Sequence, residues 1–421
     1  MRLISPFLLL IVSLFSGCER APLRSTRPLD ADAYVWQRGR PAAVSEAVRA
    51  HARAFHALVV LAAEVSWKKN DGGRTPQISR VALDWATLRD VPRLGLALRI
   101  NAYPGPFLRD DATTGALTSL ARDTLAEAAA NGVTVAELQI DFDAATAKLS
   151  GYRQWIDTLR ATASPVPLTF TALPAWLRAK DFPPLARAAD GYVLQVHSLA
   201  RPNKAEEHFT LCDPDAALAA VELAGHLNVP FRVALPTYGY TLTFDASGNF
   251  AALSAEGQHA ALKPGFTVRE VHAEPAELAT LVNTLAPDHP AALTGIIWYR
   301  LPIAGDQLNW SWSTLAAVMQ GHTPAPHLNA RPAPKGDGLV ELTLVNDGNG
   351  DFSGPVHLLT RWRQARRLGA DALNGFAITA EDTTSLQFAA AACPLPAGAQ
   401  RVIGWLRLSD PNISPDVILQ N

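Results

Sequence analysis

Two aspartates with the spacing of a catalytic pair lie in a strand-like segment, residues 137–144. Because side chains alternate along a strand, Asp141 and Asp143 share one face with Gln139, and apolar residues occupy the other face. Carboxylates two residues apart on one face would be separated by about 7 Å. Burial and like charge would raise the pKa of one carboxyl and leave the other ionised, as a general acid near neutral pH requires. The segment therefore predicts a catalytic site at Asp141 and Asp143.

The same two carboxylates also have a structural interpretation. Buried carboxylates are costly unless they are paired, and a basic group inside the sheet would satisfy them. Arg99, on the strand-like segment 94–101, is such a group. The sequence leaves the catalytic and the structural interpretations open.

Strand-like and helix-like segments alternate over residues 33–322, and a hairpin at 78–85 is set aside from this alternation. The expected strands are 33–37, 55–65, 94–101, 135–143, 167–173, 190–197, 231–235 and 293–299. Repeated strand-then-helix units predict a parallel sheet, and eight units match a closed barrel of roughly 250 residues. No G-x-G-x-x-G follows the first strand, which argues against a dinucleotide-binding sheet. We therefore expect a (β/α)8 TIM barrel, with the aspartates at the end of its fourth strand.

The composition changes after the barrel. Residues 323–336 are rich in proline and are expected to form a linker. Residues 337–421 contain short alternating segments and no convincing long helix, which predicts a small all-β sandwich. Such a domain is typical of a structural or carbohydrate-contacting accessory.

The amino terminus is predicted to be a targeting segment. Arg2 precedes the apolar run 3–15, which is too short to span a bilayer and is typical of a signal peptide. Ser16-Gly17 before Cys18 resembles the bacterial lipoprotein cleavage box, so residues 1–18 would be the signal peptide, Cys18 the lipidated residue and 19–32 a tether. Glu19 does not resemble the inner-membrane retention signal, which favours the outer membrane. The alternative is an ordinary signal peptide with an incidental cysteine.

Overall composition excludes some functions. The chain is 48% hydrophobic and 18% charged, with a net charge of −2. It has no excess of basic residues, which argues against nucleic acid as a partner. Cys212 and Cys393 lie far apart in sequence and are expected to be buried free thiols in different domains. No Cys/His spacing of the zinc type and no paired histidines accompany the aspartates, so we expect no metal and no cofactor.

The order of these features resembles a bacterial family of secreted and lipidated proteins, domain of unknown function 3142. More distantly, the barrel resembles the family-18 glycoside hydrolases, the chitinase-like barrels. Those barrels carry D-x-x-D-x-D-x-E at the end of the fourth strand, with the final Glu as general acid. In one register Asp143 takes the place of that Glu; in the other, Asp141 and Asp143 match the two inner aspartates and the acid position falls on Ala145. Neither register supplies the Glu.

Three further strands carry motifs similar to those of the chitinase-like barrels. Gln195 and His197 end the sixth strand, where those barrels present substrate-facing side chains. Tyr238 ends a segment similar to G-x-P-x-Y-G on the seventh strand, and Trp298 on the eighth matches the Trp that floors the sugar site. The resemblance implies that these four residues, with Gln139, bind substrate. Each also has a packing or hydrogen-bonding interpretation within the barrel.

The resemblance implies a cell-envelope lipoprotein that faces the periplasm or the exterior and acts on or binds an amino-sugar polysaccharide. In the chitinase-like mechanism the N-acetyl group of the substrate is the nucleophile, so Asp143 would be the acid and Asp141 would orient the amide. Glu64, at the end of the second strand, is a further carboxylate for the barrel mouth. The alternatives are a catalytically inactive carbohydrate-binding barrel and an envelope scaffold whose sandwich binds a protein partner.

Overall fold

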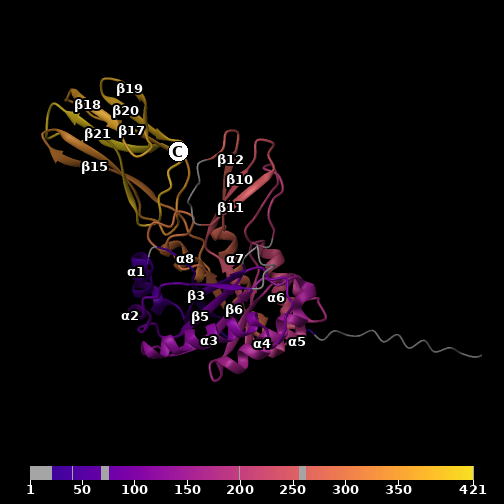
Figure 1. Ribbon diagram of the computed structural model, residues 1–421. Coiled ribbons are helices and arrows are strands. Elements are labelled where there is room, and N and C mark those ends of the chain that lie inside the picture. Colours follow the sequence, from indigo (N-terminus) through magenta and orange to yellow (C-terminus); the bar gives the residue numbers. More distant parts are fainter. Residues whose placement is uncertain (1–20, 40, 68–74, 199, 256–261, 421) are drawn as a thin grey trace, which may run out of the picture.

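A computed structural model describes residues 21–39, 41–67, 75–198, 200–255 and 262–420 (Figure 1). Its central element is a parallel sheet of eight strands, β2 (Asp30–Val35), β3 (Ala57–Trp67), β5 (Leu94–Ile100), β6 (Val135–Phe142), β7 (Leu168–Ala172), β8 (Gly191–Gln195), β9 (Phe231–Pro236) and β14 (Leu293–Tyr299). The sheet closes on itself because β2 pairs with both β14 and β3. The predicted (β/α)8 barrel is confirmed, and the two aspartates lie on and just after its fourth strand, β6.

Helices surround the barrel and follow most of its strands (Figure 1). They are α1 (Pro41–His51), α2 (Trp85–Leu88), α3 (Ala112–Ala130), α4 (Leu149–Ala163), α5 (Phe182–Ala188), α6 (Pro214–Gly225), α7 (Pro275–Leu285) and α8 (Trp312–Met319). Helix α6 begins after Asp213, whose carboxylate accepts the backbone N–H groups of Asp215 and Ala216, with Pro214 in its first turn. Among the described residues, no helix has the length and hydropathy that crossing a membrane demands.

Two additions interrupt the alternation. Strand β4 (Pro76–Arg80) pairs antiparallel with β3, which is the hairpin set aside in the sequence. Between β9 and α7, strands β10 (Gly239–Phe244), β11 (Phe250–Ser254) and β12 (Thr267–His272) form an antiparallel sheet in the order β11-β10-β12. This inserted sheet projects from the carboxyl end of the barrel (Figure 1).

The carboxyl-terminal part is a sandwich of two four-stranded sheets, which lies beside the carboxyl end of the barrel (Figure 1). One sheet contains β15 (Leu328–Gly336), β16 (Leu339–Asn346), β21 (Gln400–Leu408) and β18 (Arg367–Ala372); the other contains β19 (Ala377–Glu381), β20 (Ser385–Ala390), β17 (Val356–Arg361) and β22 (Asp416–Gln420). The linker expected at 323–336 is therefore corrected, since most of it is β15. Its prolines are tolerated because β15 is an edge strand.

Hydrogen bonds join the sandwich to the barrel. The Asp351 carboxylate accepts the backbone N–H of Ser311 at 2.7 Å, just before α8, and that of Ala397 at 2.9 Å within the sandwich. The Asp351 backbone N–H donates to the hydroxyl of Thr314, a fully buried residue of α8, at 3.1 Å. We call this set of contacts the seam. Cys212 in the barrel and Cys393 in the sandwich are free and buried, as predicted.

The amino-terminal segment is fixed at the opposite end of the barrel. Strand β1 (Arg24–Ser25) pairs with β13 (His289–Pro290), which precedes β14 and so lies at the amino-terminal end of the barrel strands. The Arg24 guanidinium donates to Glu222 at 2.6 Å and to Asp288 at 2.8 Å. The tether expected at 19–32 thus includes ordered strand from Arg24 onward, whereas residues 1–18 with Cys18 lie outside the described residues.

Candidate functional site

A cavity of about 270 Å³ opens among the carboxyl ends of the barrel strands, where TIM-barrel enzymes place their chemistry. It combines aromatic rings, carboxylates, guanidinium groups and hydroxyls. Its lining residues include Tyr34, Trp36, Arg38, Arg99, Asp141, Asp143, Thr171, Gln195, His197, Ser198, Tyr238, Tyr240 and Tyr299. Of the predicted site residues, the cavity therefore brings together Asp141, Asp143, Gln195, His197 and Tyr238.

Arg99 holds both aspartates. Strands β5 and β6 pair in a register that sets Arg99 directly beside Asp141. One guanidinium nitrogen donates to Asp141 and the other donates to Asp143 at 3.1 Å. The second oxygen of Asp141 accepts the Thr171 hydroxyl at 2.8 Å. The pairing with Arg99 that the sequence left as an alternative is confirmed.

The two carboxylates differ in their surroundings. The Asp141 side chain is 4% exposed and both of its oxygens are bound by protein groups, whereas the Asp143 side chain is 44% exposed beside the cavity. Burial and repulsion from Asp141 raise the pKa of Asp143 above its ordinary value, and Arg99 opposes this rise only in part. When both aspartates are ionised, the three groups carry one net negative charge. A proton on Asp143 removes it.

The part of the cavity lined by residues that follow β8 and β9 carries neutral hydrogen-bonding groups. The Tyr238 hydroxyl lies 3.3 Å from His197 Nδ1 and 2.9 Å from the Tyr240 hydroxyl. The Tyr240 hydroxyl in turn lies 2.6 Å from Ser198 Oγ. Burial lowers the pKa of His197 to about 3 and raises that of Tyr238 above its ordinary value, so the wall stays uncharged near neutral pH.

Three aromatic side chains form the apolar part of the cavity. Tyr34, Trp36 and Tyr299 contact one another with ring centroids 5.1 to 5.7 Å apart. Trp298, predicted as the floor of a sugar site, does not line the cavity: it is 1% exposed and packs against Trp310 in the core between the barrel and its helices. The strand presents Tyr299, the next residue, in its place.

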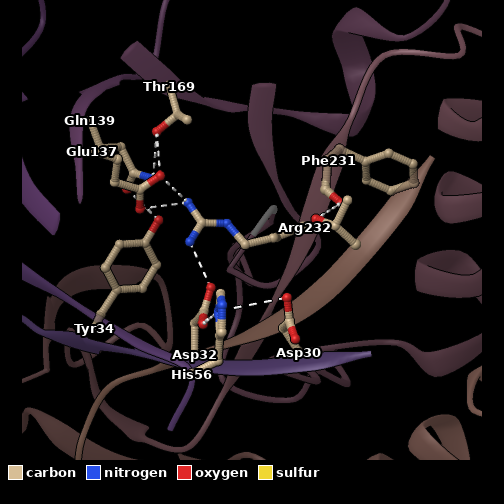
Figure 2. A network of polar contacts seen from close by, with 10 residues as sticks. Asp30, Asp32, Tyr34, His56, Glu137, Gln139, Thr169, Phe231 and Arg232 are labelled. Carbon is tan, nitrogen blue, oxygen red and sulfur yellow. Dashed lines mark hydrogen bonds and ion pairs between the residues drawn. The ribbon is translucent and has the colours of Figure 1, made fainter. Parts of the chain in front are cut away.

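Gln139 is fully buried in the barrel and is not among the lining residues of the cavity. Figure 2 shows it near Tyr34 and Thr169. Its amide oxygen accepts the Tyr34 hydroxyl at 2.6 Å, and its amide nitrogen donates to Thr169 at 3.3 Å. Figure 2 shows the ion-paired cluster beneath it, in which Arg232 reaches Asp32 at 2.7 Å and Glu137 at 2.7 Å. Gln139 thus supports Tyr34 from below and does not reach a ligand in this cavity.

Two other predicted side chains hold protein groups at the cavity. The Gln195 amide donates to the backbone carbonyl of His197 at 3.3 Å. Glu64 accepts two hydrogen bonds from Arg38, at 2.8 and 2.6 Å, and these lower the pKa of Glu64. Glu64 is therefore ionised and paired near neutral pH, and Asp143 remains the most available carboxylate at the cavity.

Sequence reasoning missed Ser198, Tyr240 and the aromatic group of Tyr34, Trp36 and Tyr299. Tyr240 had a signal, because a strand that turns Tyr238 toward the cavity also turns the side chain two residues later to that face. No group of three or more metal-ligating side chains occurs in the part of the chain that the structure describes.

Comparisons with known proteins match two stretches of the chain to protein families. Residues 105–304 match the model of a domain of unknown function, DUF3142, and residues 329–409 match a second, DUF8456. No curated protein matches the chain.

Similar solved structures include the spore cortex-lytic enzyme SleL of Bacillus cereus, which is 13% identical with a TM-score of 0.48, covering 71% of this chain and 75% of that chain. A chitinase from Chromobacterium violaceum ATCC 12472 is 17% identical with a TM-score of 0.47, covering 70% and 98%. The GH18 chitinase ChiB from the chitin utilization locus of Flavobacterium johnsoniae is 12% identical with a TM-score of 0.45, covering 70% and 94%. Two stretches of the chain thus match families of unknown function: the DUF3142 match lies within the (β/α)8 barrel and the DUF8456 match within the sandwich.

Proposed function

We propose that the cavity binds one sugar of an amino-sugar polysaccharide and that Asp143 is the general acid that cleaves the bond to the next sugar. The observation that carries this proposal is that Asp143 is exposed to the cavity with a raised pKa while Asp141 is engaged by protein groups. A protonated carboxyl in an aromatic cavity is the group that glycoside hydrolysis needs beside the leaving oxygen.

Among the described residues that line the cavity, Asp143 is the one carboxylate that protein groups leave partly free, so the substrate supplies the nucleophile. Asp143 gives its proton to the glycosidic oxygen while the bond from that oxygen to the anomeric carbon breaks. The carbonyl oxygen of the substrate's acetamido group bonds to the anomeric carbon. Water then attacks that carbon, breaks the new bond and returns a proton to Asp143. The amide-orienting role predicted for Asp141 is replaced by a positioning role, because Asp141 holds Arg99 and Thr171.

The test is release of reducing ends from N-acetylglucosamine hexamers by the purified protein and by Asp143→Asn. The expected result is a loss of at least about 100-fold, the usual contribution of a general acid. Asp157→Asn is the matched control, since among the described residues the ion pair of Asp157 is with Arg153 on the surface of α4. Equal rates for the wild type and Asp143→Asn would overturn the acid role.

A second function, binding without hydrolysis, is favoured by one observation: Arg99 pairs with both carboxylates. It predicts hexamer binding without turnover. Tyr299→Ala would weaken that binding because it removes an aromatic face from the cavity, while Trp298→Phe, outside the cavity, would not.

The cellular setting is part of the proposal. We propose a lipid anchor on Cys18 that holds the protein in the envelope, with the outer membrane favoured, and the sandwich as the surface for any protein partner. Metabolic labelling with an alkyne fatty acid should mark the wild type and not Cys18→Ala. Equal labelling of both would contradict the anchor.

A further inference from the structure

The hydroxyls of Ser198, Tyr240 and Tyr238 and the imidazole of His197 form one continuous hydrogen-bonded chain. Its three links measure 2.6, 2.9 and 3.3 Å in that order. The members come from three places: His197 and Ser198 follow β8, Tyr238 follows β9, and Tyr240 belongs to β10 of the inserted sheet. All four line the cavity. We call this the hydroxyl chain.

Local sequence explains how the two tyrosines meet. Tyr238 and Tyr240 are two residues apart and turn to the same face, with ring centroids at 5.1 Å. Gly239 between them pairs with His272 of β12, and a Cβ there would lie 2.6 Å from both the His272 ring and the Val271 carbonyl. Only glycine therefore lets β10 approach β12 this closely while it delivers Tyr240 to the cavity.

The protons of the hydroxyl chain can point in either direction. With the imidazole proton on Nε2, Ser198 donates to Tyr240, Tyr240 to Tyr238, and Tyr238 to His197. With that proton on Nδ1, the direction of each bond reverses, and the Ser198 hydroxyl can donate a hydrogen bond to a partner in the cavity. The Ser198 end can thus accept a hydrogen bond or donate one. It does so without any charge, because burial lowers the pKa of His197 to about 3.

Ser198 itself is held in an unusual conformation. Its φ of +57° is in the left-handed region, which costs a residue with a side chain on the order of 1 kcal/mol. Serine persists there although glycine would adopt this backbone more easily. Strain of this kind is typical of functional positions, where the side chain itself is required.

We propose that Ser198 and Tyr240 are specificity-determining residues that bind a neutral hydrogen-bonding substituent of the sugar at the part of the cavity lined by the hydroxyl chain. This inference rests on the proposed function. The adaptable end of the chain serves a hydroxyl or an amide. A charged substituent held at the hydroxyl chain is disfavoured, because it would lose hydration there and none of the four members of the chain supplies a countercharge. The inserted sheet acquires a role, since β10 carries Tyr240 to the ligand.

The experiment measures binding of N-acetylglucosamine and glucosamine hexamers by calorimetry, and the KM and kcat of any hydrolysis. Ser198→Gly and Tyr240→Phe should each weaken binding of the acetylated hexamer about 3- to 10-fold, the value of one neutral hydrogen bond, with kcat changed less than KM. Since both residues belong to one chain, the double variant should lose less than the product of the single losses. Wild type should bind the charged glucosamine hexamer more weakly.

Ser198→Gly also distinguishes a role of Ser198 in ligand specificity from a role in the stability of the fold. Glycine relieves the strained backbone, so the melting temperature should hold or rise while binding falls; a purely structural serine would lower both. Thr241→Val is the matched control, because the buried Thr241 hydroxyl, next to Tyr240, has no hydrogen-bond partner among the described residues. Unchanged binding in Ser198→Gly and Tyr240→Phe would overturn this inference but would not affect the acid role proposed for Asp143. Failure of the wild type to bind either hexamer would overturn both proposals.

Discussion

At the scale of residues, Asp143 is a carboxylate whose ionised form is less favourable in the folded protein than in the unfolded chain. Its pKa in the folded protein is raised, chiefly by burial and then by Asp141, in spite of the bond to Arg99. A carboxyl that only stabilised the fold through its ion pair would show the opposite shift, as Glu64 does beside Arg38. Functional groups are commonly kept at such a cost to stability.

This shift predicts the sign of a stability change. A raised pKa means that ionised Asp143 destabilises the folded state, so its favourable contribution is present below the unfolded pKa and is lost as the pH rises through the folded pKa. Asp143→Asn should therefore raise the melting temperature at pH 7, with no gain at pH 3. Thermal melts at both pH values check this.

Asp141→Asn is the comparison, since Asp141 is the more buried partner of Arg99. It should destabilise the fold by about 3 kcal/mol or more, because it breaks a buried pair. If Asp143→Asn lowered the melting temperature at pH 7 as Asp141→Asn does, Asp143 would be a structural partner of Arg99.

At the scale of elements, closure of the barrel depends on how closely β14 approaches β2. A Cβ on Gly295 would lie 2.5 Å from the backbone carbonyl of Asp30. Gly295 pairs with Asp30 in the parallel register that closes the sheet. Strand packing thus requires glycine at position 295.

Gly295→Ala should destabilise the protein by about 1–3 kcal/mol, the usual cost of overpacking. Gly115→Ala in α3 is the matched control, since nothing lies within 4 Å of a Cβ there and alanine is the better helix former. Chemical denaturation of the two variants provides the measurement. Equal stability of both would show that the β2–β14 contact can relax.

Much of the element order could be predicted from the sequence, because apolar strands alternating with amphipathic helices have few solutions. The position of Asp141 on the fourth strand follows from that count. The face of Trp298 could not be predicted in this way: the pairing of β14 with β9 shifts between Leu293 and Gly295, and a shift of one residue reverses which side chains face inward. The strand β15 was hidden by its prolines, which are normal on an edge.

At the scale of the whole molecule, the seam joins the sandwich to two residues of the barrel, Ser311 just before α8 and the buried Thr314 within it. The Asp351 carboxylate accepts a backbone N–H from each side, and the buried Thr314 hydroxyl accepts one from Asp351. We therefore expect the two parts to unfold together.

The two buried thiols can report on this separately, because Cys212 belongs to the barrel and Cys393 to the sandwich. In moderate denaturant a thiol reagent should label both at one rate in the wild type. Asp351→Ala should let Cys393 react before Cys212, since the sandwich then opens alone. Peptide mass spectrometry over time resolves the two sites. Separate labelling rates already in the wild type would contradict a single cooperative unit.

The ion pairs of Arg24 with Glu222 and Asp288 bear on how the cavity would be oriented relative to a membrane anchor at the amino terminus. They fasten the incoming chain at the amino-terminal end of the barrel, and the cavity with Asp143 opens at the other end. With a lipid on Cys18 as proposed, the bilayer would lie behind the amino-terminal end of the barrel. The protein would then work on strands of polymer that reach it from in front, and glycans still attached to its own membrane would be out of its reach.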